Sequence, residues 1–131
     1  MSQENVDVVR RLHGAFNEGD MAGFIRLTDP NVEWWDHEDD PGATVHRGHD
    51  GVSTFLAELD QDMELQIEPL EYIDAGDHVV VGVRLVGCGR ASGVPFDEKE
   101  VHVSRLRDGL VIEIREYREM SEALKAVGLA E

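Results

Sequence analysis

The residues of this chain that are best suited to acid–base chemistry lie in the stretch EVHVSRLRDGLVIEIREYR, residues 100–118. Alternation in its first half places His102 and Ser104 on one face of a strand, and Val101 and Val103 on the other. Histidine exchanges a proton near neutral pH, as general acid–base catalysis requires. Polar side chains on an otherwise apolar face therefore indicate either a lined pocket, with His102 as its catalytic candidate, or a structural histidine hydrogen-bonded inside the core.

The acidic loop at residues 36–50 offers a different chemistry, because it holds several side chains of the kinds that bind metal ions. Two histidines and one carboxylate can hold a divalent ion with open coordination positions. No pair of these residues recurs at a helical or strand spacing that would preorganise a site, so we expect a solvated loop and no metal. The residues concerned are Asp36, His37, Asp39, Asp40, His46 and His49.

Helices are predicted wherever apolar residues recur at helical spacing. The first helix ends at the Asn-Glu-Gly signal of residues 17–19, and Asp20 caps a second, shorter one. A third follows Gly48, and a short last helix over residues 122–127 has Ser121 as its expected cap. Helices therefore dominate the first half of the chain, apart from a short strand at the Val-Glu-Trp-Trp sequence that ends at residue 35.

The second half of the chain predicts antiparallel strands. Residues 78–86 alternate, with Val79, Val81 and Val83 on one face. The Asp-Gly pair at residues 108–109 predicts a tight hairpin turn, and Pro69 predicts a bulge or an edge. Helices followed by a meander of strands indicate an α+β domain, with the helices packed on one face of a curved antiparallel sheet and a concave cavity between the layers.

The length of the chain indicates the number of domains, and its charge limits the kinds of partner that it could bind. The 131 residues suit one domain, 1–131, and the formal charge of −16 argues against nucleic acid and against an anionic membrane surface. The sequence has no apolar run of membrane-spanning length and no signal-peptide core, so we expect a cytoplasmic protein. Cys88 is the single cysteine, so it can form no intrachain disulfide. The glycines of the loop around Cys88 do not have the spacing of a nucleotide-binding motif.

Seven phrases, in order, carry a resemblance that covers nearly the whole chain: VVRRLHGAFNEGD, DPNVEW, HRGHDGVSTFL, YIDAGDHVVVGVRL, SGVPF, HVSRLRDGLVIEIREY and SEALKAVGL. Together they resemble the SnoaL-like branch of the nuclear transport factor 2-like superfamily. The resemblance implies a cone-shaped domain with a pocket between the helices and the inner sheet face, and a homodimer through the sheet. It implies no single activity, because similar proteins include isomerases, polyketide cyclases, hydrolases, dehydratases and proteins without chemistry.

Ketosteroid isomerases of this superfamily use an Asp base with Tyr and protonated Asp donors. The resemblance places the tyrosine position at Leu12, the base position at Trp34 and the protonated acid position at His102. Two of the three groups are apolar here, so that mechanism is not expected. His13, next to the tyrosine position, is expected at the solvent or partly buried. The comparison also places Arg84 and Glu116 on the inner face, together with Ser104.

The leading hypothesis is a small-molecule pocket protein that performs acid–base catalysis, without a cofactor, on an apolar cyclic substrate. His102 would exchange the proton and Arg84 would polarise an oxygen. Glu116 would act as a base if desolvation raised its pKa, or would only form an ion pair that holds strands together. The substrate would lie against Phe16 and Trp34, with Leu12 and Ser104 completing the expected binding set.

Two alternatives stay open at this stage. One is a ligand-binding module of the same fold that performs no chemistry, and the other is a dimeric interaction module whose pocket is filled by bulky side chains. In the expected homodimer, Val101, Val103 and Val111 would cover part of the outer sheet face.

Overall fold

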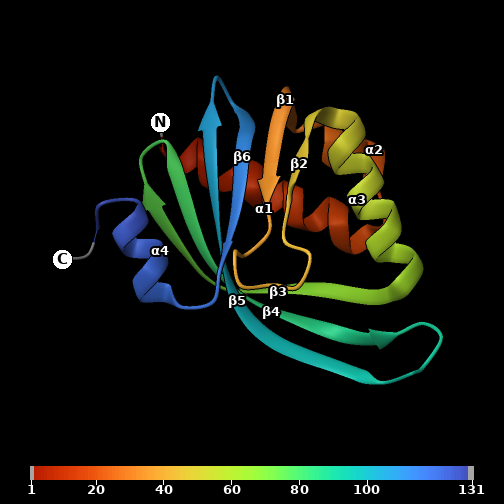
Figure 1. The fold of residues 1–131 in the computed structure, drawn as a ribbon. Coiled ribbons are helices and arrows are strands. Elements are labelled where there is room, and N and C mark those ends of the chain that lie inside the picture. Colours follow the sequence, from red (N-terminus) through yellow and green to blue (C-terminus); the bar gives the residue numbers. More distant parts are fainter. Residues whose placement is uncertain (1, 130–131) are drawn as a thin grey trace.

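The computed structural model describes residues 2–129 and, at Ser2, the backbone alone. Six strands and four helices form the fold (Figure 1). The helices are α1 Ser2–Glu18, α2 Met21–Arg26, α3 Gly48–Asp62 and α4 Met120–Ala126. The strands are β1 Thr28–Trp35, β2 Val45–Arg47, β3 Met63–Ala75, β4 His78–Gly89, β5 Pro95–Arg107 and β6 Leu110–Tyr117.

The strands form a single curved sheet in the order β2-β1-β6-β5-β4-β3. The predicted meander of β3 to β6 is antiparallel throughout, as is the pairing of β1 with β2, and the one parallel pair in the sheet joins β1 and β6. The reason is the long connection between them: the chain passes through α3 and the meander of β3, β4 and β5 before β6 returns beside β1 (Figure 1).

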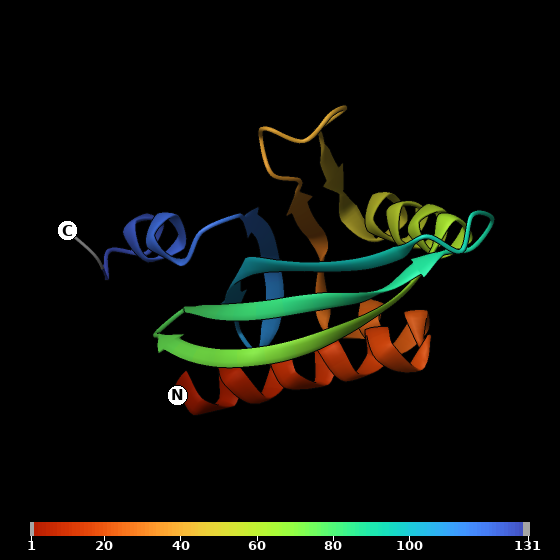
Figure 2. The same cartoon turned by 90° about the horizontal axis from the view of Figure 1, so that it is seen from below.

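The first three helices line the concave face of this sheet, as predicted. Figure 2 shows α1 running along the strands β3 and β4, whereas α3 packs beside β1 and β2 near the other end. The main core lies between these layers. Val79, Val81 and Val83 of β4 all point into it and are fully buried, against Leu12 of α1 and Phe24 of α2.

Most of the turns, bulges and helix caps that the local sequence predicts are present in the structure. Asp108 and Gly109 both have positive φ, at 53° and 78°, which is the backbone of the predicted hairpin turn. The pairing of β3 with β4 shifts register just after Pro69, which confirms the predicted bulge. The last helix differs, because α4 starts at Met120 and is capped by Glu119 instead of Ser121.

The outer face of the sheet is covered in part by α4. Val101 and Val103 pack there against Ala123 of that helix, in a second small core. Val111 lies instead in the main core, because a bulge in β6 leaves residue 112 unpaired and reverses the alternation. The proposed dimer surface of these three valines was therefore wrong: the chain itself covers all of them.

Candidate active site

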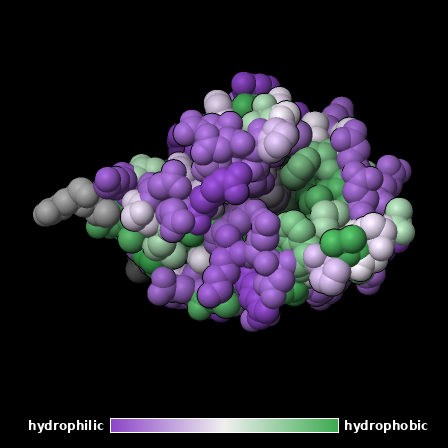
Figure 3. All heavy atoms as spheres, turned by 60° about the horizontal axis from the view of Figure 1, so that its bottom comes forward, coloured by the Kyte–Doolittle hydropathy of each residue, from purple (hydrophilic) through white to green (hydrophobic). Residues whose placement is uncertain are grey.

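A cavity of about 280 Å³ opens between the inner sheet face, α1 and α3. Figure 3 shows a hollow whose wall is hydrophobic on one side and hydrophilic on the other. Ten of the lining residues are apolar: Phe16, Trp34, Pro41, Phe55, Leu59, Met63, Leu65, Ile67, Leu85 and Phe96. An open cavity contradicts the alternative in which bulky side chains fill the cone.

The ionisable part of the wall is centred on His102 and Glu116, which are direct partners on the neighbouring strands β5 and β6. His102 is 5% exposed, and its Nε2 lies 3.1 Å from Oε1 of Glu100, two residues earlier on the same face. The indole Nε1 of Trp34 donates a hydrogen bond of 2.6 Å to Oε2 of Glu116. The structure thus brings together three of the predicted site residues: His102, Glu116 and Trp34.

The surroundings of Glu116 raise its pKa above that of a solvated glutamate. Burial of the carboxyl group raises its pKa, and the negative charges of Glu100 and Asp36 act in the same direction. His102 and the Trp34 hydrogen bond oppose that rise without cancelling it. A carboxyl group whose pKa is raised is better matched to proton transfer near neutral pH than an ordinary glutamate.

Trp34 forms the aromatic centre of the site. Its ring centroid lies 6.2 Å from Phe24, 5.2 Å from Phe55 and 6.0 Å from His102, which it meets edge to face. Alternation along β1 predicted its inward direction, because Val32, two residues earlier, belongs to the same core. This packing restrains the indole that holds Glu116 in place.

Leu12 and Ser104 are buried beside the cavity. They line a void of about 10 Å³ that shares Trp34 and His102 with the main cavity, and they are not among the residues that line the cavity itself. His13 borders the same void and is buried, with 5% of its surface exposed, so the expectation of a solvent-facing or partly buried side chain was wrong. Burial lowers its pKa to about 3, so the imidazole is neutral. It lies on the face of α1 that packs onto β3, with Nδ1 at 3.4 Å from the Tyr72 hydroxyl.

Arg84 does not reach the cavity. It follows Val83, which faces the core, so its own side chain projects from the outer face of the sheet. There its guanidinium pairs with the carboxylate of Asp97 at 2.5 and 2.8 Å. The expected role of Arg84 in polarising a substrate oxygen was therefore wrong.

The acidic loop contributes to the site in a way that its sequence did not reveal. Asp36, Asp40 and Pro41 line the cavity, where a solvated loop was expected. Asp36 is tied back to His46, whose Nε2 lies 3.2 Å from both carboxylate oxygens. Within residues 2–129, no three histidine, cysteine or acidic side chains are grouped closely enough to hold a metal ion.

Sequence reasoning missed several lining residues, and alternation could have found some of them. Glu100 and Phe96 have the same parity as His102 on β5, so the face that holds the histidine also holds them. Phe55 and Leu59 lie on the apolar side of α3 together with the buried Val52.

The architecture defines a class: an α+β domain whose curved sheet and helices enclose one apolar cavity with acid–base groups on its wall. A sequence profile described as the SnoaL-like domain matches residues 9–114, and the chain belongs to this family. No curated protein matches the sequence. In the part of the chain that is described, no helix has the length and apolar character to cross a membrane.

Solved structures confirm the nuclear transport factor 2-like fold. An NTF2-like protein from Burkholderia xenovorans is 27% identical, with a TM-score of 0.78 and 97% of each chain covered. TerC co-crystallised with polyporic acid is 22% identical, with a TM-score of 0.79, and the match covers 95% of this chain and 98% of TerC. A protein with a ketosteroid isomerase-like fold from Catenulispora acidiphila, in complex with trimethylamine, is 20% identical. Its TM-score is 0.76, with 93% of this chain and 92% of that chain covered.

Proposed function

We propose that this protein binds a small, mostly apolar molecule in the 280 Å³ cavity and transfers a proton to or from it through His102 and Glu116. One observation carries the proposal: these two ionisable residues are direct partners on adjacent strands and both line the wall of a cavity that is otherwise mainly apolar. A low-dielectric wall with two proton carriers suits isomerisation, cyclisation or dehydration, in which one group removes a proton and the other supplies one.

The two groups differ in the roles they suit. Glu116 is the better base, because burial raises its pKa and makes the carboxylate a stronger proton acceptor than a solvated glutamate. His102 suits the complementary step, since the Glu100 carboxylate accepts a hydrogen bond from Nε2–H and orients the ring. Phe16 and Trp34 would hold the apolar body of the substrate.

The structural relatives support the binding half of this proposal. TerC was crystallised with polyporic acid and the Catenulispora protein with trimethylamine, so this fold accommodates small molecules of different character.

Binding without chemistry is the second candidate, and one observation favours it. Both proton carriers already have partners within the chain, Glu100 for His102 and Trp34 for Glu116. A substrate would have to displace or share these hydrogen bonds before any proton could move.

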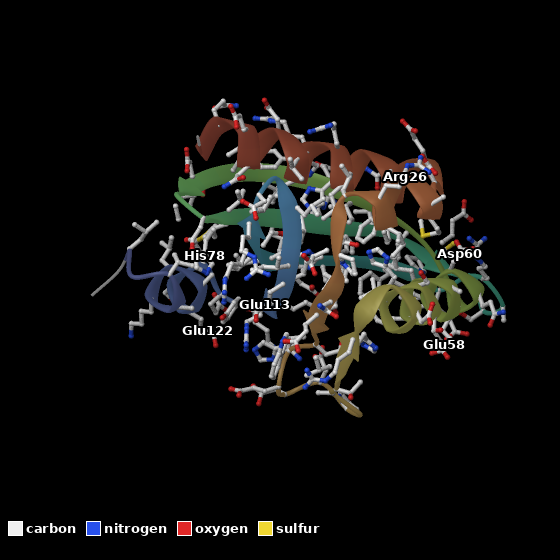
Figure 4. All side chains as sticks on the ribbon, turned by 90° about the horizontal axis from the view of Figure 1, so that it is seen from above. Arg26, Glu58, Asp60, His78, Glu113 and Glu122 are labelled. Atoms are coloured by element: carbon white, nitrogen blue, oxygen red, sulfur yellow. The ribbon has the colours of Figure 1, made fainter. Side chains whose placement is uncertain are left out.

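Two measurements test the proposal in sequence. A thermal-shift panel of steroid-like, terpenoid and polyketide-like compounds should yield a ligand that, at about a hundred times its Kd, raises the unfolding midpoint by roughly 5–15 °C. That ligand is then incubated with the protein and examined by NMR, which also detects isomers of equal mass. Conversion that is lost in both His102→Gln and Glu116→Gln, but kept in Glu58→Gln on the outside of α3 (Figure 4), supports catalysis. Recovery of unchanged ligand favours the binding module.

We also propose a homodimer that uses the part of the outer sheet face left open by α4. The family resemblance supports it, and the half-buried Trp35 with the Arg115 guanidinium 4.0 Å above its ring lies on that open part. A monomer mass by light scattering at micromolar concentration would contradict the dimer.

A further inference from the structure

We infer that the cavity selects a ligand with an apolar body and a positively charged nitrogen, and rejects an anion of the same shape. This inference rests on the proposed function, since it assigns a chemical class to the molecule that the cavity would bind.

The charge of the cavity wall carries the inference. Five of its fifteen residues are ionisable, and four of these are carboxylates: Asp36, Asp40, Glu100 and Glu116. The fifth is His102, and no lysine or arginine of the described residues lines the cavity. A substrate carboxylate or enolate would therefore meet negative groups without a fixed positive partner on the wall.

Three of the four carboxylates already have a positively charged or titratable partner. Asp40 pairs with Arg118, Asp36 lies 3.2 Å from His46, and Glu100 lies 3.1 Å from His102. Glu116 is the exception in the described part of the chain, because no lysine or arginine pairs with it and its hydrogen-bond donor is the neutral indole of Trp34. His102 lies beside Glu116 on β5, but its Nε2 is already within hydrogen-bond distance of Glu100.

This arrangement of charges should make the cavity select a cation over an anion. A cation that leaves water for an apolar cavity recovers its lost hydration only if it meets a negative partner, and Glu116 offers one. Four aromatic residues also line the same wall, Phe16, Trp34, Phe55 and Phe96, and an aromatic ring attracts a cation that lies over its face. The ligand completes the pairing that the chain leaves open, whereas an anion would add a fifth negative charge to the wall.

The test uses three probes with one carbon skeleton: 3-phenylpropylamine, 3-phenyl-1-propanol and 3-phenylpropanoate. Calorimetry at pH 7.5, with low salt and EDTA, measures each Kd. We expect the ammonium to bind at least tenfold more tightly than the alcohol, and the alcohol at least tenfold more tightly than the carboxylate. Charge-assisted hydrogen bonds are roughly twice as strong as neutral ones, which favours the ammonium over the alcohol, and repulsion from the wall carboxylates disfavours the carboxylate probe.

Variants test whether the preference for the ammonium arises from Glu116 and from binding inside the cavity. Glu116→Gln should lower the preference for ammonium over alcohol about tenfold, while the matched variant Glu58→Gln, which removes the same charge from the outside of α3, leaves it unchanged (Figure 4). Leu85→Trp narrows the cavity and should weaken the binding of all three probes. Ammonium binding that survives in Leu85→Trp would place the cation on the acidic surface and overturn the inference.

The outcomes separate the inference from the proposed function. The inference is overturned if the alcohol or the carboxylate binds as tightly as the ammonium and this binding is lost in Leu85→Trp. That result would still support a ligand-binding cavity. Failure of all three probes at millimolar concentration contradicts both. The comparison among probes in the wild-type chain stands even if Glu116→Gln fails to fold.

Discussion

Replacement of Trp34 by phenylalanine tests the contact on which the geometry of the site depends. Trp34 is 5% exposed, and its Nε1 donates a hydrogen bond of 2.6 Å to the partly buried carboxyl group of Glu116. Phenylalanine keeps an aromatic ring in the same position but removes the donor. The carboxyl group then loses the one hydrogen bond that compensates its burial.

The expected cost has two parts. A hydrogen bond to a charged group contributes roughly 1.5–3 kcal/mol to stability. The smaller ring also removes the equivalent of about two buried CH groups, or roughly 1.5 kcal/mol. Trp34→Phe should therefore lower the free energy of unfolding by about 3–4.5 kcal/mol. A domain of this length has a stability on the order of 7–20 kcal/mol, so the variant should still fold.

A double-mutant cycle separates the two parts. Urea unfolding at pH 7.5, followed by far-UV circular dichroism, gives the stability of the wild type, Trp34→Phe, Glu116→Met and the double variant. Circular dichroism is used in place of tryptophan fluorescence, because Trp35 would be the only tryptophan left in the Trp34 variants. We expect a coupling energy of about 1.5–3 kcal/mol, the hydrogen-bond part. Coupling below about 0.5 kcal/mol would refute the claim that Trp34 holds Glu116.

Three further predictions concern other parts of the molecule. The pKa of His13 is lowered to about 3 from 6.5, so the unfolded chain binds this proton first, and stability falls as pH decreases below 6.5. The loss should be about 1.4 kcal/mol between pH 7.5 and pH 5.5 in urea titrations, and His13→Leu should remove it. Gly87→Ala would place Cβ 1.7 Å from a backbone oxygen of β3, so it should cost more than about 2 kcal/mol, whereas Gly14→Ala, with open space around it, should gain roughly 0.5–1 kcal/mol. Arg84→Gln should leave the Kd of any cavity ligand unchanged in calorimetry, because the guanidinium pairs on the opposite sheet face; a weaker Kd would contradict that placement.

Much of the fold could be predicted because its signals are local. The helix stop at Gly19, the cap at Asp20, the hairpin turn at Asp108 and the bulge at Pro69 each depend on the conformational preferences of a few neighbouring residues. Alternation likewise placed His102 on a different face from Val101 without any knowledge of the partners of the strand.

Several features of the site depend on contacts between distant segments, and these the sequence could not supply. Alternation divides β4 into two faces, but the packing of α1 decides which face is inside, and that choice excludes Arg84 from the cavity. One bulge in β6 reverses the direction of Val111. The loop carboxylate of Asp36 reaches the wall because β1 lies parallel to β6.

The sequence by itself thus determined most of the elements, their turns and the alternation of the strands outside the bulge in β6, because these follow from short-range sterics and periodicity. Tertiary structure alone decided that Glu116 lies opposite His102, that Trp34 donates to it, and that carboxylates dominate the ionisable part of the wall. The physical reason is that a register and a burial pattern are properties of pairs of segments. Their energies arise only when strands far apart in the chain are brought together and desolvated.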